Sequence, residues 1–294
     1  MRTCARCTGF AATLILGLVL LERTAGAQAT AVPIPHGTLE LVTEDQWIAP
    51  GHEFRLGLNY KLEKSWHIYW VNPGDSGEPP RVEWKLSAGL TPGAIEWPTP
   101  QRLGTSGIVD FGYEENVMLI VPMRADRSVA DQQSVEVGAE VKVLVCREIC
   151  IPGKVQLSLA LPIKSQPPAS EIRTSGLFAA SRKSLPQPAP TNWKFNVYEG
   201  KESFILVANL GHRISSAVFF PLNESQISNS ASQRVVPVGT GFRMTLQKSD
   251  QLLKPIARLK GVLVLSADRA YLIDVPVSKP AVLKNSSVTS RNSF

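Results

Sequence analysis

Short runs in which apolar and polar residues alternate fill residues 37–163. The clearest is EFRLGLNYKL, in which one face carries Phe54, Leu56, Leu58, Tyr60 and Leu62. Similar runs are TLELVTED, HIYWVN, RVEWKL, AIEWPTP, NVMLIVPMRA, SVEVGAEVKVLVC and KVQLSLALPI. Turn residues separate them, as in NPGD at 72–75 and EPP at 78–80. This pattern predicts an all-β, immunoglobulin-like sandwich over residues 30–164.

The second half of the chain repeats this kind of patterning after a change in composition. Residues 165–191 are rich in Pro, Ser and Ala, with a weak helical stretch at 170–184, and are interpreted as a linker. Six further strand candidates follow, which predicts a second, smaller β-domain at 192–280. The Ser- and Asn-rich tail, 281–294, is expected to be disordered.

Residues 1–29 have the features of a secretory signal peptide. Arg2 and Arg6 precede an apolar stretch at 10–21, and Ala27 and Ala29 offer cleavage sites. The apolar stretch is shorter than the roughly 20 residues that a membrane-spanning helix needs, although a retained anchor is the alternative. We therefore expect an exported protein in the periplasm, without stable membrane insertion.

Charge adds little to this picture. The formal net charge of +6 falls by two when the leader, with three arginines and one glutamate, is removed. The sequence contains no run of five or more basic residues and no nucleic-acid-binding motif. Nucleic acid is therefore not an expected partner.

The cysteines are the main candidates for chemistry. Cys4 and Cys7 leave with the leader, so Cys146 and Cys150 can pair only with each other or with a partner. A disulfide between them would close a short loop and add little stability. This favours a disulfide that takes part in thiol exchange over one that only stabilises the fold. A structural disulfide and a metal site remain open as alternatives.

The metal alternative would use the two thiolates to bind Cu(I), which prefers soft sulfur ligands. The histidines that could assist are His36, His52, His67 and His212. None has a fixed, close spacing to the cysteines, and His67 is the best of them. The leading interpretation needs neither a cofactor nor a resident metal.

Four sequence blocks carry a resemblance to a known family. They are WHIYWVNPGDSGEPPRVEW, IEWPTPQRL, FGYEENVMLIVP and VKVLVCREICIPG, in that order. Together they resemble the N-terminal periplasmic domain of transmembrane thiol:disulfide interchange reductases of the DsbD type, closest to the branch associated with suppression of copper sensitivity. The resemblance covers residues 37–161 well and implies an immunoglobulin-like sandwich, in agreement with the strand pattern.

The resemblance implies that Cys146 and Cys150 are the exchanging pair. By position, Cys150 is similar to the cysteine that forms mixed disulfides, and Cys146 to the one that resolves them. A nearby positive charge would favour the thiolate. Arg147 could supply it, but Glu148 beside it opposes the effect, and the sequence leaves the balance open.

In the resembled family a short loop with an aromatic residue caps the cysteines. The matching segment here is 109–113, with Phe111 as the best candidate for the shield and Asp110 and Tyr113 beside it. Tyr69 and Trp66 are expected to line the same pocket. The alternative is that these aromatic residues belong to the core of the sandwich.

The family's membrane and thioredoxin-like domains have no counterpart in the sequence given. The expected partners are therefore extracytoplasmic thioredoxin-like proteins and a separate membrane thiol-electron transporter. The expected function is a thiol:disulfide exchange module of the protein-disulfide reductase type. The alternatives are a non-enzymatic, partner-binding β-sandwich with a structural disulfide, and a Cu(I)-handling protein that uses the same thiols.

Overall fold

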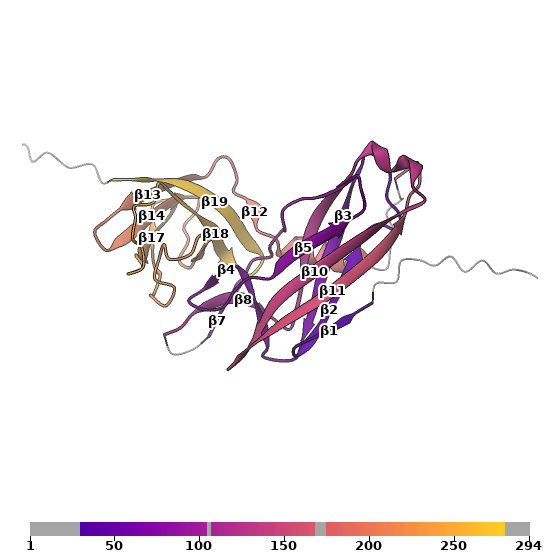
Figure 1. Ribbon diagram of the computed structural model, residues 1–294. Coiled ribbons are helices and arrows are strands. Elements are labelled where there is room, and N and C mark those ends of the chain that lie inside the picture. The colour runs from indigo at the N-terminus through magenta and orange to yellow at the C-terminus, as the bar shows by residue number, and fades with distance from the viewer. Residues whose placement is uncertain (1–29, 105–106, 168–174, 280–294) are drawn as a thin grey trace, which may run out of the picture.

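Two β-domains and one helix make up the computed structural model, which describes residues 30–104, 107–167 and 175–279. Figure 1 shows the first domain, coloured from indigo to pink, packed beside the second, coloured from orange to yellow. The predicted leader, 1–29, and the predicted tail, 281–294, lie outside the described residues. Among those described, no helix is long and apolar enough to cross a membrane.

The first domain is a sandwich of two sheets with a short 3-10 turn, η1, between two of its strands. Its elements are β1 (Val32–Ile34), β2 (Gly37–Thr43), β3 (Glu53–Leu62), β4 (His67–Gly74), β5 (Arg81–Leu86), β6 (Leu90–Pro92), β7 (Gln101–Leu103), β8 (Asp110–Glu114), β9 (Asn116–Ala125), η1 (Arg127–Asp131), β10 (Ser134–Cys146) and β11 (Cys150–Pro162). One sheet has the order β1-β2-β3-β9-β6, and the other has β11-β10-β4-β8-β7 with β5 paired to β10.

Strand β3 shows why these residues form a sandwich. The apolar face predicted from the alternation is buried throughout, with Leu56, Leu58 and Tyr60 at 0% exposure. Leu56 and Leu58 belong to the core between the two sheets. Gly57 and Asn59, on the opposite face, are also buried, so something covers the outside of this sheet.

Helix α1 (Ser175–Ser184) provides that cover. Its Phe178 is fully buried in a cluster with Val42, Met118 and Ile120 of the outer sheet face. The hydroxyl of Ser181 donates a hydrogen bond of 2.7 Å to the carbonyl of Met118. The helix lies within the segment interpreted as a linker, and it is packed against the first domain.

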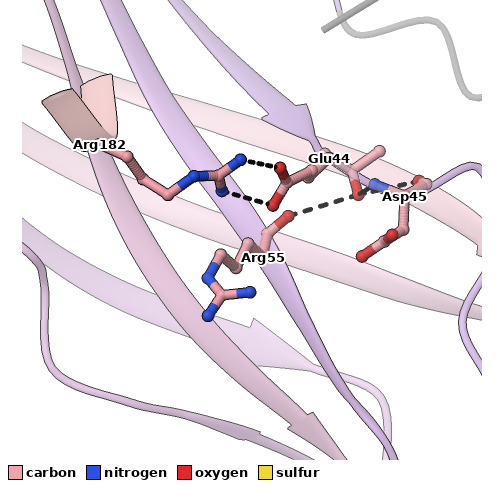
Figure 2. A network of polar contacts seen from close by, with 5 residues as sticks. Glu44, Asp45, Arg55 and Arg182 are labelled. Carbon is pink, nitrogen blue, oxygen red and sulfur yellow. Dashed lines mark hydrogen bonds and ion pairs between the residues drawn. The ribbon is translucent and has the colours of Figure 1, made fainter. Parts of the chain in front are cut away.

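An ion pair fixes the C-terminal half of α1, as Figure 2 shows. The guanidinium of Arg182 makes two hydrogen bonds with the carboxylate of Glu44, of 2.9 and 2.5 Å. The backbone of Glu44 is itself held, because its N–H donates to the carbonyl of Arg55. The helix is thereby tied to the chain between β2 and β3.

The second domain is built from one eight-stranded sheet that folds around its own core. Its strands are β12 (Gln187–Pro188), β13 (Lys194–Glu199), β14 (Ser203–Asn209), β15 (Val218–Pro221), β16 (Arg234–Val238), β17 (Gly241–Gln247), β18 (Arg258–Ser266) and β19 (Arg269–Ser278). The order is β15-β18-β19-β13-β14-β17-β16, with β12 paired to β19. A short parallel pairing of β13 with β19 joins the two halves.

The prediction of an all-β chain with two β-domains is confirmed. The NPGD turn predicted at 72–75 is wrong in its position, because β4 continues through Pro73 to Gly74. The pairing of β4 with β8 is interrupted between Tyr69 and Gly74, which accommodates a proline without an N–H donor. The chain changes direction only after Gly74, whose φ is +98°.

Candidate functional site

The two cysteines close the tip of the long β10–β11 hairpin. Cys146 is the last residue of β10 and Cys150 the first of β11, and the two are paired in register. A disulfide joins them, with their Cα atoms 4.2 Å apart. The three residues between them form the turn, in which the N–H of Arg147 donates to the carbonyl of Ile149.

The two cysteines differ in their access to solvent. Cys146 is only 2% exposed, and its backbone pairs with His67 on the neighbouring strand β4. Cys150 is exposed at the edge of the sheet. Because disulfide exchange requires a thiolate to reach one sulfur directly, Cys150 is the more accessible of the two cysteines to an external thiol.

Tyr69 of β4 reaches the disulfide. Its hydroxyl lies 3.5 Å from Sγ of Cys150, within hydrogen-bonding distance for sulfur. Burial raises the pKa of Tyr69, although hydrogen bonding with Ser76 partly opposes the rise. The phenol therefore stays protonated at neutral pH and can donate its hydrogen to the sulfur.

Asp110, the first residue of β8, bonds to Ser76 in the loop after β4. The backbone N–H of Ser76 donates to Oδ1 of Asp110 at 2.9 Å, and the Ser76 hydroxyl is 3.0 Å from each carboxylate oxygen. Burial raises the pKa of Asp110, while the hydrogen bonds from Ser76 lower it. Asp110 thus holds the loop that follows β4, and Gly77 of this loop lies against the Tyr69 ring.

An aromatic stack lies beside the turn of the hairpin. The guanidinium carbon of Arg147 lies 5.2 Å from the centre of the Trp66 ring, in a cation–π contact. Trp66 stacks on His36 with ring centres 3.6 Å apart, and His36 Nδ1 lies 2.8 Å from Oε2 of Glu63. The guanidinium of Arg147, the residue that follows Cys146 in the sequence, is therefore held over the Trp66 ring.

His67 is buried beside Cys146, with which its backbone pairs, and beside the ring of Tyr69. Its ring packs edge-on against Tyr69, with centres 5.2 Å apart, and its Nε2 has no hydrogen-bond partner among the described residues. Burial lowers the pKa of His67, so the ring is neutral at physiological pH. Within the described ranges, no cluster of three or more His, Cys, Asp and Glu residues could hold a metal.

The other two predicted cap residues lie in the interior. Phe111 is 0% exposed, with its ring edge-on to Trp70 and to Phe220 of the second domain. The hydroxyl of Tyr113 donates to the carbonyl of Pro98 inside the first domain. A shielding role for Phe111 stays a prediction, and in this structure the aromatic side chain at Cys150 is that of Tyr69.

The structure therefore brings together only part of the predicted set. Tyr69 contacts the disulfide, Asp110 bonds to Ser76 in the loop beside Tyr69, and Trp66 contacts Arg147 in the turn between the cysteines. The sequence interpretation missed Ser76, because its role depends on the loop after β4 folding back towards β8. The alternation of side chains along β4 places Tyr69 on the opposite face from Ile68 and Trp70, and Trp66, which directly precedes β4, belongs to the core with them. This pattern is the sequence signal that distinguishes Tyr69 from Trp66.

Comparison with known families bears on the first domain. Residues 38–162 match the family described as thiol:disulfide interchange protein DsbD, N-terminal. No curated protein sequence matches the chain significantly.

Comparison with solved structures extends over both domains. The N-terminal periplasmic domain of ScsB from Proteus mirabilis is similar, with a TM-score of 0.64 and 14% identity. The match covers 84% of this chain and 97% of the ScsB chain. Domains 5–6 of the S-layer protein SbsC and the periplasmic chaperone SfaE give TM-scores of only 0.22 and 0.19, each at 8% identity.

Proposed function

We propose that this protein is a periplasmic thiol:disulfide exchange module, because residues 38–162 match the family of DsbD N-terminal domains. It relays two electrons between partner proteins through Cys146 and Cys150. The observation that carries the proposal is the unequal exposure of the two cysteines at one hairpin tip. The partners are thioredoxin-like proteins and a membrane thiol-electron transporter.

Electrons enter by thiol attack on the exposed sulfur. A thiolate of the reduced donor attacks Sγ of Cys150, the Cys146–Cys150 bond breaks, and Cys146 leaves as a thiolate that takes up a proton. The second thiol of the donor then loses its proton and attacks the donor sulfur bound to Cys150. The donor leaves as a disulfide, and both cysteines of the module are reduced.

Electrons leave by the same steps in reverse order. The Cys150 thiolate attacks the disulfide of an oxidised acceptor and displaces one acceptor thiolate, which is then protonated. Cys146, after losing its proton, attacks Sγ of Cys150 and releases the second acceptor thiolate. The hydroxyl of Tyr69 donates a hydrogen bond to Cys150 while that sulfur carries negative charge.

A structural disulfide is less compatible with this hairpin. The two strands are already paired along their whole length, from Ser134 with Pro162 to Cys146 with Cys150. A covalent link at the closed end of a hairpin adds little further restriction to the unfolded chain. The copper alternative is separated from exchange by titrating the reduced protein with Cu(I).

Trapping of mixed disulfides tests the proposal. The reduced Cys146→Ser variant is mixed with an oxidised thioredoxin-like protein and analysed without reducing agent. We expect a covalent adduct through Cys150, and none with the matched Cys150→Ser variant. Adducts with Cys150→Ser alone would reverse the roles, and the absence of adducts from both variants would contradict the relay.

A further inference from the structure

The residues that follow Tyr69 form a cover over its ring. This 72–77 segment ends at Gly77, whose φ is +79°. A Cβ placed on Gly77 would lie 2.0 Å from Cζ of Tyr69, so the backbone lies directly against the ring. Any displacement of the segment would therefore release Tyr69, whose hydroxyl contacts Cys150.

The second domain holds this segment by hydrogen bonds. The side-chain amide of Asn72 donates to the carbonyl of Pro221 at 2.7 Å. The side-chain amide of Asn229 donates to Oδ1 of Asp75 at 2.9 Å. Oδ2 of Asp75 accepts the backbone N–H of Val109 at 2.8 Å, so this carboxylate joins the second domain to the start of β8.

Asn229 is itself fixed in place. It is only 6% exposed, and its backbone carbonyl accepts a hydrogen bond from the guanidinium of Arg102 on β7. The side chain and the main chain of this one residue thus bond to two different parts of the first domain. Removing one of these partners leaves a polar group of the buried Asn229 unpaired, which costs free energy.

An apolar contact lies beside these hydrogen bonds. Phe220 of β15 is 4% exposed and packs edge-on against both Trp70 and Phe111, with ring centres 6.3 and 5.2 Å away. Val262 and Ala270 of the second domain belong to the same buried cluster as the core of the first. The two domains are therefore packed together at the segment that covers Tyr69.

From these contacts we propose that the second domain positions the redox site, with Asn229 as the positioning residue. Asn229 holds Asp75, Asp75 holds the 72–77 segment on the Tyr69 ring, and the segment holds the Tyr69 hydroxyl at Cys150. A donor fixed in advance stabilises the thiolate without reorganisation. This assignment rests on the proposed function and gives the second domain a part in it.

The experiment measures how fast Cys150 in the reduced full chain is alkylated by iodoacetamide, with mass spectrometry of the peptide that contains it. Tyr69→Phe should slow alkylation at pH 7 about tenfold, because a hydrogen bond to a charged group is lost. Asn229→Ala should slow it about threefold and move the pH profile upward. The matched control Asn209→Ala, an exposed hydrogen-bonded asparagine of the same domain, should leave the rate unchanged.

The decisive comparison is made in the Tyr69→Phe background. If Asn229 acts through Tyr69, Asn229→Ala should cause no further slowing there. Equal slowing in both backgrounds, or an unchanged rate for Asn229→Ala alone, would overturn the proposal. These rates need no partner protein, so their outcome is independent of the trapping experiment that tests the relay.

A double variant that exchanges the two side chains, Asp75 and Asn229, shows whether the effect comes from this hydrogen bond or from a general loss of structure. Combining Asp75→Asn with Asn229→Asp reverses donor and acceptor and leaves an oxygen to accept the N–H of Val109. This double variant should recover most of the wild-type alkylation rate, whereas Asn229→Asp alone places two carboxylates together and should not. Failure of the double variant to recover, with wild-type thermal unfolding, would contradict the role of this bond.

Discussion

The hydroxyl of Tyr69 lies 3.5 Å from Sγ of Cys150. A phenol in this position donates a stronger hydrogen bond to a thiolate than to a disulfide sulfur, so it favours the reduced state. Tyr69→Phe should make the reduction potential more negative by about 30 mV, which corresponds to about 1.4 kcal/mol. Equilibration with glutathione buffers measures the change.

Tyr113→Phe is the matched control for that measurement. Its hydroxyl is also buried and hydrogen-bonded, but to the carbonyl of Pro98 in the interior. The control should lower stability by about 1 kcal/mol and leave the potential unchanged. Equal potentials for Tyr69→Phe and wild type would contradict a role for Tyr69 at the thiolate.

The burial of Asp110 predicts how the stability of the protein depends on pH. Its pKa in the folded protein is raised from the ordinary value of 3.8, mainly by desolvation. Ionisation therefore costs the folded state more than the unfolded state, and stability is lost as pH rises from 3.8 through the raised pKa. Asp110→Asn removes this loss, so its stability relative to wild type should increase from pH 3 to pH 7.

Urea denaturation at the two pH values checks this prediction. The control is Asp131→Asn, which alters an exposed carboxylate at the end of η1 and should change the free energy of unfolding by about 0.5 kcal/mol or less. A relative stability of Asp110→Asn that falls as pH rises would contradict the sign.

Ile149 is an apolar side chain that is exposed to solvent. It is 63% exposed in the turn between the two cysteines, next to the sulfur that is expected to react. Ile149→Ser should slow exchange with a protein partner about fivefold, because apolar area is no longer buried on docking. Exchange with glutathione should be unchanged, since a small thiol buries little surface.

Leu253→Ser serves as the control, because Leu253 is 89% exposed on the second domain and distant in sequence from the turn. It should alter neither rate. Equal slowing of Ile149→Ser with glutathione and with the protein partner would show that the substitution acts on the disulfide and not on docking.

Helix α1 should matter for stability and not for redox chemistry. Phe178→Ala empties a fully buried site against the outer sheet face and should lower the free energy of unfolding by about 3 to 4 kcal/mol. Leu177→Ala, at a position 43% exposed on the same helix, should change it by about 0.5 kcal/mol or less. Denaturation with urea measures both, and a changed reduction potential in Phe178→Ala would contradict this separation.

The strands and the cysteine pair could be predicted from the sequence. The alternation of side chains within β4 and β8 also indicates which residues face the core and which face the site. In β4, Ile68 and Trp70 face the sandwich core, while Tyr69 between them faces the disulfide. In β8, Phe111 and Tyr113 face the core, whereas Asp110 bonds to Ser76. The period of two thus separates the core aromatics from the residues of the site.

Other features could not be obtained from local patterns. The contact between Asn229 and Asp75 joins residues 154 positions apart, and it depends on how two domains pack. The weak helical stretch gave no indication that Phe178 would pack against Val42 of β2 and Met118 and Ile120 of β9. Such long-range contacts depend on side-chain packing between elements, which periodicity within one element does not encode.

The reduction potential of the Cys146–Cys150 disulfide tests the central claim most directly. Equilibration of the wild-type protein with a series of glutathione buffers, followed by alkylation and mass spectrometry, gives the value. An exchanging pair should have a potential above about −300 mV, within reach of thioredoxin-like partners. A value well below about −300 mV would identify a disulfide that resists exchange and would contradict the relay.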